Sequence, residues 1–91
     1  MNLYTKDGKP LQVLGDKVYS QSGTVVGKIK SEKVFGPDGR YIGTIVNDRL
    51  VYRSTHSASA SSPFASANRA GTARSNRAAS AMWGDEPDIP D

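Results

Sequence analysis

The sequence predicts an all-β fold, an antiparallel meander of three to four repeated hairpins with a low-complexity C-terminal tail. Two observations lead to this prediction. A pair of large apolar residues recurs every 15 to 16 residues through the first half of the chain, and a glycine turn follows each of the first three pairs. The rest of the chain contains almost no Val, Ile, Leu or Tyr. Self-similarity at a fixed short period is the signature of a repeat architecture.

The repeated pairs and turns mark four successive units. The pairs are Leu3-Tyr4, Val18-Tyr19, Val34-Phe35 and Leu50-Val51. The turns that follow the first three pairs are Lys6-Asp7-Gly8, Gln21-Ser22-Gly23 and Pro37-Asp38-Gly39. Each unit is interpreted as a short strand, a tight turn and a longer strand. We therefore expect strands near residues 2–5, 10–14, 17–20, 24–29, 33–36, 40–46 and 49–53.

The third turn indicates the type of hairpin loop. Pro37 has no backbone N–H, so it cannot pair across a two-residue turn centred on Asp38 and Gly39. It fits the second position of a type I turn, with Gly39 in the left-handed conformation, which is the three-residue loop with a glycine bulge. By the repeat, Gly8 and Gly23 are also predicted at positive φ.

Glycines also occur inside the two longer strands that follow the second and third turns. Gly27 and Gly43 occupy equivalent places there. Glycine within a strand marks a bulge or a close approach of backbone. The favoured interpretation is a bend that lets the hairpins pack around a crowded centre. The alternative is a site where a ligand approaches the backbone.

The fourth unit departs from the other three. Ser54-Thr55 stands where the first and third units have Asp-Gly, and the return strand at 57–61 would contain only Ser and Ala. Either a weak eighth strand therefore closes the assembly, or its place is taken by the tail or by another chain.

Composition and charge divide the chain into three segments. Residues 1–53, with 60 as the furthest limit, form the β-hairpin repeat domain and carry a net charge of +4. Residues 54–82 have Ser or Ala at 17 of 29 positions, carry +3, and are interpreted as a linker or a weakly helical tail. Residues 83–91 carry −4. Because residues 54–82 lack the apolar surface that offsets ordering entropy, we expect them to make few contacts with the repeat domain.

Missing residue types exclude most catalytic chemistry. Cysteine is absent, which removes disulfides, thiolate metal sites and cysteine nucleophiles. His56 has no acid nearby in sequence, so we interpret it as a surface histidine rather than a catalytic base. We expect no enzymatic activity, cofactor or metal. No apolar run approaches the roughly 18 to 20 residues of a membrane span, and no signal segment is recognised, so a cytoplasmic location is expected.

The order of these elements resembles the small bacterial four-fold beta flower proteins. The resemblance rests on the three apolar–aromatic pairs with their turns, on Gly39-Arg40-Tyr41-Ile42-Gly43 and on Trp83-Gly84-Asp85-Glu86, and it covers nearly the whole chain. It implies four hairpins around a pseudo-four-fold axis, and it implies no activity. The fourth unit departs from the family pattern. The repeats also lack the tryptophans that such repeats often carry, so a ligand site made by those rings does not carry over.

One candidate for function is a set of three aromatic residues. Tyr4, Tyr19 and Phe35 occupy the same place in successive units. Rotational symmetry would place them in one ring. The favoured interpretation is that this ring packs the hairpins together. The alternative is a binding surface for a small molecule or a peptide.

A second candidate is the acidic end of the chain. Trp83, Asp85 and Glu86 form a possible partner-docking motif, since tryptophan offers a large contact area and acids steer association. The alternative is that this segment folds back on the basic repeat domain.

The sequence favours a non-catalytic binding or protein-interaction module that meets an unknown protein partner through Trp83. The alternative is a basic nucleic-acid-binding accessory protein, because 12 Lys and Arg stand against 9 Asp and Glu and could neutralise phosphates. A domain of this size without disulfides or metal is marginal, and its last strand presents an unpaired edge. We therefore also expect a homo-oligomer, in the first place a dimer.

Overall fold

A computed structural model describes residues 3–56 and 60–90 of the chain. Short strands alternate with longer ones, as the repeat predicts. They are β1 (Leu3–Thr5), β2 (Pro10–Leu14), β3 (Lys17–Tyr19), β4 (Val25–Lys30), β5 (Lys33–Phe35), β6 (Tyr41–Val46) and β7 (Arg49–Val51), followed by a 3₁₀ turn η1 (Ser54–His56). The all-β fold class is confirmed. None of the helical structure in the described ranges is long and apolar enough to cross a membrane.

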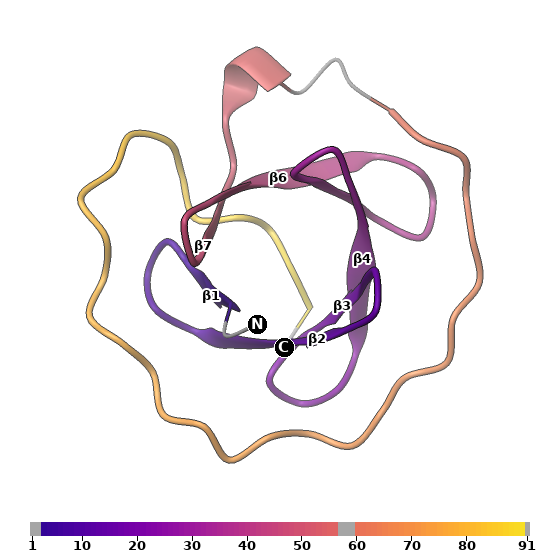
Figure 1. Cartoon of the computed structure of the whole chain (residues 1–91), viewed down its shortest axis with the longest axis horizontal. Helices are drawn as coiled ribbons and strands as arrows, with labels where there is room; N and C mark the ends of the chain where they lie inside the picture. The colour runs from indigo at the N-terminus through magenta and orange to yellow at the C-terminus, as the bar shows by residue number, and fades with distance from the viewer. Residues whose placement is uncertain (1–2, 57–59, 91) are drawn as a thin grey trace.

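The strands form a closed barrel in sequence order (Figure 1). Each strand from β1 to β6 pairs antiparallel with the next, and β7 pairs parallel with β1, with Tyr4 opposite Arg49 and Thr5 opposite Leu50. β7 thus covers the edge that β1 would otherwise expose. Part of the weak eighth strand considered at 57–61 lies outside the described residues. Its end is not a return strand, because Ala60 bridges Arg40 at the third hairpin.

The three hairpin turns have the predicted geometry. Gly8, Gly23 and Gly39 have φ values of 99°, 97° and 85°. Each glycine donates its N–H to the carbonyl three residues earlier, at 2.8–3.0 Å. The residue after each of these glycines closes the loop. Its carbonyl accepts an N–H from the opposite strand end at 2.8 Å, and the three residues are Lys9, Thr24 and Arg40. This is the three-residue loop that Pro37 indicated.

The core lies on the barrel axis and is built from the first residue of each repeated pair. Leu3, Val18, Val34 and Leu50 are all fully buried. Leu11 and Val26 complete the fully buried cluster. Because successive side chains of a strand point to opposite faces, the second residue of each pair faces away from this core. The pseudo-four-fold arrangement is therefore an inner ring of aliphatic side chains.

Gly27 and Gly43 permit close packing next to bulges. Val18 pairs with Gly27 and Tyr19 with Val25, which leaves Val26 as the extra residue of a bulge. A Cβ built on Gly27 would lie 2.3 Å from the carbonyl oxygen of Phe35, so β5 packs directly on this glycine. A Cβ on Gly43 would lie 2.9 Å from a methyl group of Leu50. Protein atoms fill the space at both positions, which supports the packing interpretation over a ligand approach.

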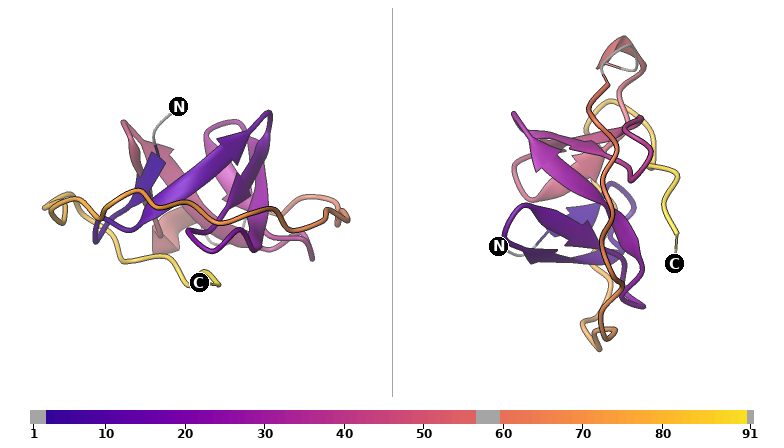
Figure 2. Two further views of the ribbon diagram at one scale, coloured as in Figure 1. Left: turned by 90° about the horizontal axis from the view of Figure 1, so that it is seen from below. Right: turned by 90° about the vertical axis from the view of Figure 1, so that its right-hand side faces the viewer.

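Residues 60–85 wrap around the barrel (Figure 1). Figures 1 and 2 show residues 60–85, which we call the belt, as an extended chain that follows the rim of a disc measuring 32 × 31 × 19 Å. The expectation of few contacts between residues 54–82 and the repeat domain is wrong. The belt donates backbone hydrogen bonds to all three hairpin turns. It is held by main-chain polar contacts rather than by apolar burial, and its small side chains let it pass close to the turns.

Residues 86–90 leave the rim and cross one open end of the barrel (Figure 1). Pro87 is buried, and Ile89 packs against the core cluster. The acidic end of the chain therefore folds back on the barrel.

Candidate functional site

The chain leaves the barrel and returns to it at the same place. After β7 it runs through Tyr52 and η1 into the belt, and the belt comes back to Tyr52 at Asp85. These two residues exchange both backbone hydrogen bonds, Tyr52 N–H to Asp85 O at 2.9 Å and Asp85 N–H to Tyr52 O at 2.8 Å. The side chains gathered around this bridge form what we call the belt junction. They are Tyr41, Thr44, Tyr52, Arg53, His56 and Trp83.

An aromatic cluster forms the inner part of the belt junction. The ring of Tyr41 is 8% exposed and lies 5.5 Å from the ring of Tyr52 and 6.2 Å, edge to face, from that of His56, measured between centroids. The Tyr41 ring also contacts that of Phe35, at 6.4 Å between centroids. The cluster links β5 and β6 with the segment that follows β7.

A chain of hydrogen bonds connects the same residues. The backbone N–H of Arg53 donates to the Tyr41 hydroxyl at 3.2 Å. The Tyr41 hydroxyl lies 2.6 Å from that of Thr44, which in turn lies 2.7 Å from Nδ1 of His56, and both contacts are hydrogen bonds. His56 is half-buried, and Thr44 and Tyr41 hold it against β6.

Trp83 forms the outer part of the belt junction and is 56% exposed. The guanidinium carbon of Arg53 lies 4.1 Å from the centroid of its ring, in cation–π contact. The next residue, Gly84, has φ 116°, and a Cβ there would lie 2.4 Å from a methyl group of Val51. The belt therefore touches β7 directly behind Trp83, which keeps the indole at the surface.

Asp85 and Glu86, the two acids close to Trp83 in the sequence, anchor the chain to the barrel. Glu86 accepts hydrogen bonds from the Thr5 hydroxyl at 2.8 Å and from the backbone N–H of Asp7 at 2.9 Å. It therefore fixes the end of the belt to the first hairpin. Asp85 makes the backbone bridge to Tyr52. The structure thus separates the docking candidates into two anchoring residues and one exposed tryptophan.

The three aromatic residues at equivalent repeat positions lie outside the aliphatic core, with Tyr4 and Tyr19 beneath the belt and Phe35 against Tyr41. Tyr19 is 6% and Phe35 is 4% exposed, and Tyr4 is half-buried. Belt arginines lie over the tyrosine rings, Arg77 at 4.9 Å from the centroid of Tyr4 and Arg69 at 5.6 Å from that of Tyr19. Sequence reasoning missed these arginine partners.

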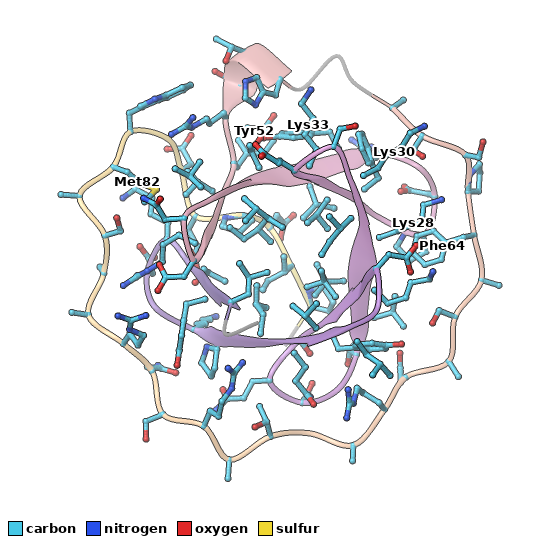
Figure 3. The ribbon with its side chains drawn as sticks, in the orientation of Figure 1. Lys28, Lys30, Lys33, Tyr52, Phe64 and Met82 are labelled. Carbon is cyan, nitrogen blue, oxygen red and sulfur yellow. The ribbon has the colours of Figure 1, made fainter. Side chains whose placement is uncertain are left out.

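Lysines form a basic ridge on the outer face of β3, β4 and β5. Lys17 is the cross-strand partner of Lys28, and Lys30 is that of Lys33. Figure 3 shows the belt residue Phe64 beside Lys28. The ammonium groups of Lys17 and Lys28 lie 5.2 and 5.5 Å from its ring centroid.

Asp16 lies at one end of this basic ridge. Its carboxylate pairs with Lys17 at 2.9 Å, and this hydrogen bond lowers the pKa of Asp16.

Other features of the surface are less organised for chemistry. A cavity of about 400 Å³ lies between the second hairpin turn, the belt residues Gly71, Thr72 and Asn76, and Ile89. Of the described residues that line it, Lys9 is the charged one. Within residues 3–56 and 60–90, no group of three or more His, Cys, Asp or Glu could hold a metal ion.

Comparison with known protein families identifies the family that has this architecture. The model of the family described as 4-fold beta flower protein matches residues 1–85, which include the barrel, the belt and the junction at Asp85. The chain belongs to the 4-fold beta flower protein family. No curated protein matches this beta flower. No solved structure matches it either.

Proposed function

We propose that this beta flower is a non-catalytic interaction module that binds a protein partner through Trp83 at the belt junction. One observation carries the proposal. Among the described residues, the only exposed large hydrophobic side chains are Trp83, at 56%, and Leu14, at 58%. Trp83 alone of the two is stacked on a cation and backed by a glycine contact.

An indole that is already held in place lowers the entropic cost of forming an interface. A tryptophan buries a large area on binding and is a frequent hot-spot residue. Arg53 already holds the indole, so less conformational freedom is lost when a partner closes over it. The occupant that fits is a protein surface with an apolar pocket for the indole and with basic groups toward the exposed Asp85 and Asp88.

The test compares two equally exposed apolar residues. Full-length protein, Trp83→Ala and Leu14→Ala are used as baits, and a captured protein is then purified and titrated against all three. We expect the affinity to fall by about tenfold or more for Trp83→Ala, as for an interface hot spot, and to stay unchanged for Leu14→Ala. The single tryptophan should shift its fluorescence to shorter wavelength on binding. Equal affinities of the three proteins would refute the proposal.

The basic ridge favours a second function. Paired cations at Lys17–Lys28 and Lys30–Lys33 suit a polyphosphate chain, as in a nucleic-acid-binding accessory protein. Salt dependence separates the two functions. Binding of a fluorescent single-stranded oligonucleotide should weaken steeply between about 50 and 200 mM salt, whereas docking of the indole should change little.

A further inference from the structure

The belt contacts the hairpin turns at an interval of eight residues. The backbone N–H groups of Ser61, Arg69 and Arg77 donate to the carbonyls of Gly39, Gly23 and Gly8, at 2.8–2.9 Å. The next residue at this interval is Asp85, which bridges Tyr52. The belt thus meets the third, second and first turns in that order and then reaches the belt junction.

A second hydrogen bond follows each of the first three contacts, three residues further along the belt. Phe64, Thr72 and Ser80 donate their N–H groups to the carbonyls of Pro37, Gln21 and Lys6, at 2.8–3.0 Å. Each hairpin turn therefore presents the carbonyls of its first and third residues to the belt. We call such a pair of carbonyls a station.

The side chains follow the same interval. Arg69 begins the belt segment at the second turn and lies over Tyr19. Arg77 begins the segment at the first turn and lies over Tyr4, and Arg74, three residues earlier, lies over the same ring at 5.2 Å. At the third station the unit has Phe35, and Ser61 stands in the place of the arginine. Arginine and tyrosine thus occur together.

The turn glycines provide an independent sign that the stations are shaped for a chain. A Cβ would lie 1.9 Å from the carbonyl oxygen of Arg77 at Gly8 and 1.7 Å from that of Arg69 at Gly23. At Gly39 the corresponding distance, to the carbonyl oxygen of Ser61, is 2.1 Å. Type I turns with a glycine bulge need these glycines for φ alone. Here all three also admit a neighbouring backbone.

We propose that the ring of hairpin turns is a peptide-binding surface for an extended segment with arginines eight residues apart. Its occupant in cis is the chain's own belt, and its occupant in trans is the belt of a second copy. Main-chain hydrogen bonds of this kind are made by any extended peptide that adds to exposed backbone groups. The Arg–Tyr contacts and the eight-residue interval supply the selectivity. A second copy carries the same belt, so exchange between copies keeps every contact, as in domain swapping.

The first experiment offers the belt as a separate peptide. The probe is a fluorescent synthetic peptide of residues 60–85, and the receptor is the full chain carrying Arg69→Ala and Arg77→Ala, whose own belt is weakened. We expect saturable binding to this variant, with at least about tenfold weaker binding to the unchanged protein, because a tethered belt competes at an effective concentration in the millimolar range.

A matched peptide tests the interval. It carries one additional alanine after Ala73, so that Arg69 and Arg77 stand nine positions apart while Arg74 keeps its distance from Arg77. It should bind the variant about tenfold more weakly, since only one arginine station can then be engaged at a time. Equal binding of the two peptides would overturn the proposal. Adding Trp83→Ala to the receptor should not weaken peptide binding, because Trp83 belongs to the receptor's own belt and not to the stations. This result separates the surface from the proposed docking site.

The double variant of the first experiment is checked for its β-sheet circular dichroism before use. The second experiment does not use this variant. The chain has no cysteine, so Leu14→Cys and Ser75→Cys proteins can each be labelled at one thiol, with donor and acceptor dyes respectively. After mixing at high concentration, belt exchange should bring the dyes together and produce energy transfer in a dimeric fraction. Absence of energy transfer, together with absence of peptide binding, would overturn the proposal.

Discussion

At the scale of single residues, glycine is required for positive φ at some positions and also for the close approach of another backbone at others. Gly15, between β2 and β3, has φ 62°, and no atom of residues 3–56 or 60–90 comes within 4 Å of an added Cβ. Gly23 has φ 97° and lies against the backbone of Arg69. Both need the left-handed conformation, but only Gly23 also makes room for the belt.

This difference predicts unequal losses of stability. Gly15→Ala should lower the free energy of unfolding by about 1 kcal/mol, the cost of a left-handed alanine. Gly23→Ala should lower it by about 3 kcal/mol, because the two belt hydrogen bonds at that station contribute roughly 1 kcal/mol each. Urea denaturation of the two variants measures both values. Equal losses would mean that the belt does not lie on the turn.

An ion pair between the belt and the barrel should make stability depend on pH. Asp48 lies in the turn between β6 and β7 and accepts a hydrogen bond from Arg77 of the belt. This bond lowers the pKa of Asp48 below its ordinary value of 3.8. A carboxyl whose pKa is depressed by folding contributes stability above its unfolded pKa and loses it as the pH falls through the folded value.

The corresponding variant is Asp48→Asn. We expect the native protein to exceed it in stability at pH 7 by a small amount, since the pair is exposed, and the difference to vanish as the pH falls below 3.8. Urea midpoints measured between pH 7 and acidic pH give the comparison. A difference that persists at acidic pH would contradict this role of the Arg77 bond.

At the scale of elements, η1 is held by one buried hydroxyl. Thr44 of β6 stands between the Tyr41 hydroxyl and Nδ1 of His56, and it is 7% exposed. Its replacement by valine keeps the shape and removes both hydrogen bonds. The cost of leaving a buried polar partner unsatisfied is about 1–3 kcal/mol.

Thr44→Val should therefore destabilise the protein by about 1–3 kcal/mol. It should also speed hydrogen exchange of the His56 amide, which donates to the Arg53 carbonyl at 2.8 Å. The exposed Thr55 lies in the same short helix, and Thr55→Val serves as the control with little effect. Unchanged exchange at His56 in the Thr44 variant would show that η1 does not depend on this bridge.

The strands and turns could be predicted from the sequence because their causes are local. Glycine at fixed intervals and Pro37 in the third turn specify loop geometry without reference to the rest of the chain. The belt could not be predicted from composition, since Ser, Ala and Arg bury little apolar surface. Its stability comes from carbonyls that become available only after the hairpins form. The spacing of Arg69 and Arg77 by eight residues was the signal that could have revealed it.

At the scale of the whole molecule, the same distinction applies to the candidate site. Trp83 was identified from its residue type, and the structure leaves it exposed. Glu86 was grouped with it by proximity in sequence, yet it anchors the first hairpin. The Tyr41–Thr44–His56 chain was missed because barrel closure brings these residues together. Residue type was thus enough to predict the exposed Trp83, whereas the topology of the barrel determines which residues lie around it.

The direction of the belt has a mechanical consequence. The barrel strands progress around the axis from the first unit to the fourth, and the belt returns past the third, second and first turns on the outside. The two windings have opposite sense, and the belt lies on the outside of the barrel along residues 60–85 (Figures 1 and 2), so this segment can be peeled off its turns from the Asp85 end. Tension applied beyond Asp85 would open the stations one at a time. Each step would release eight residues, or about 26–29 Å of extended chain. The belt would therefore lengthen in discrete steps while the barrel stayed closed.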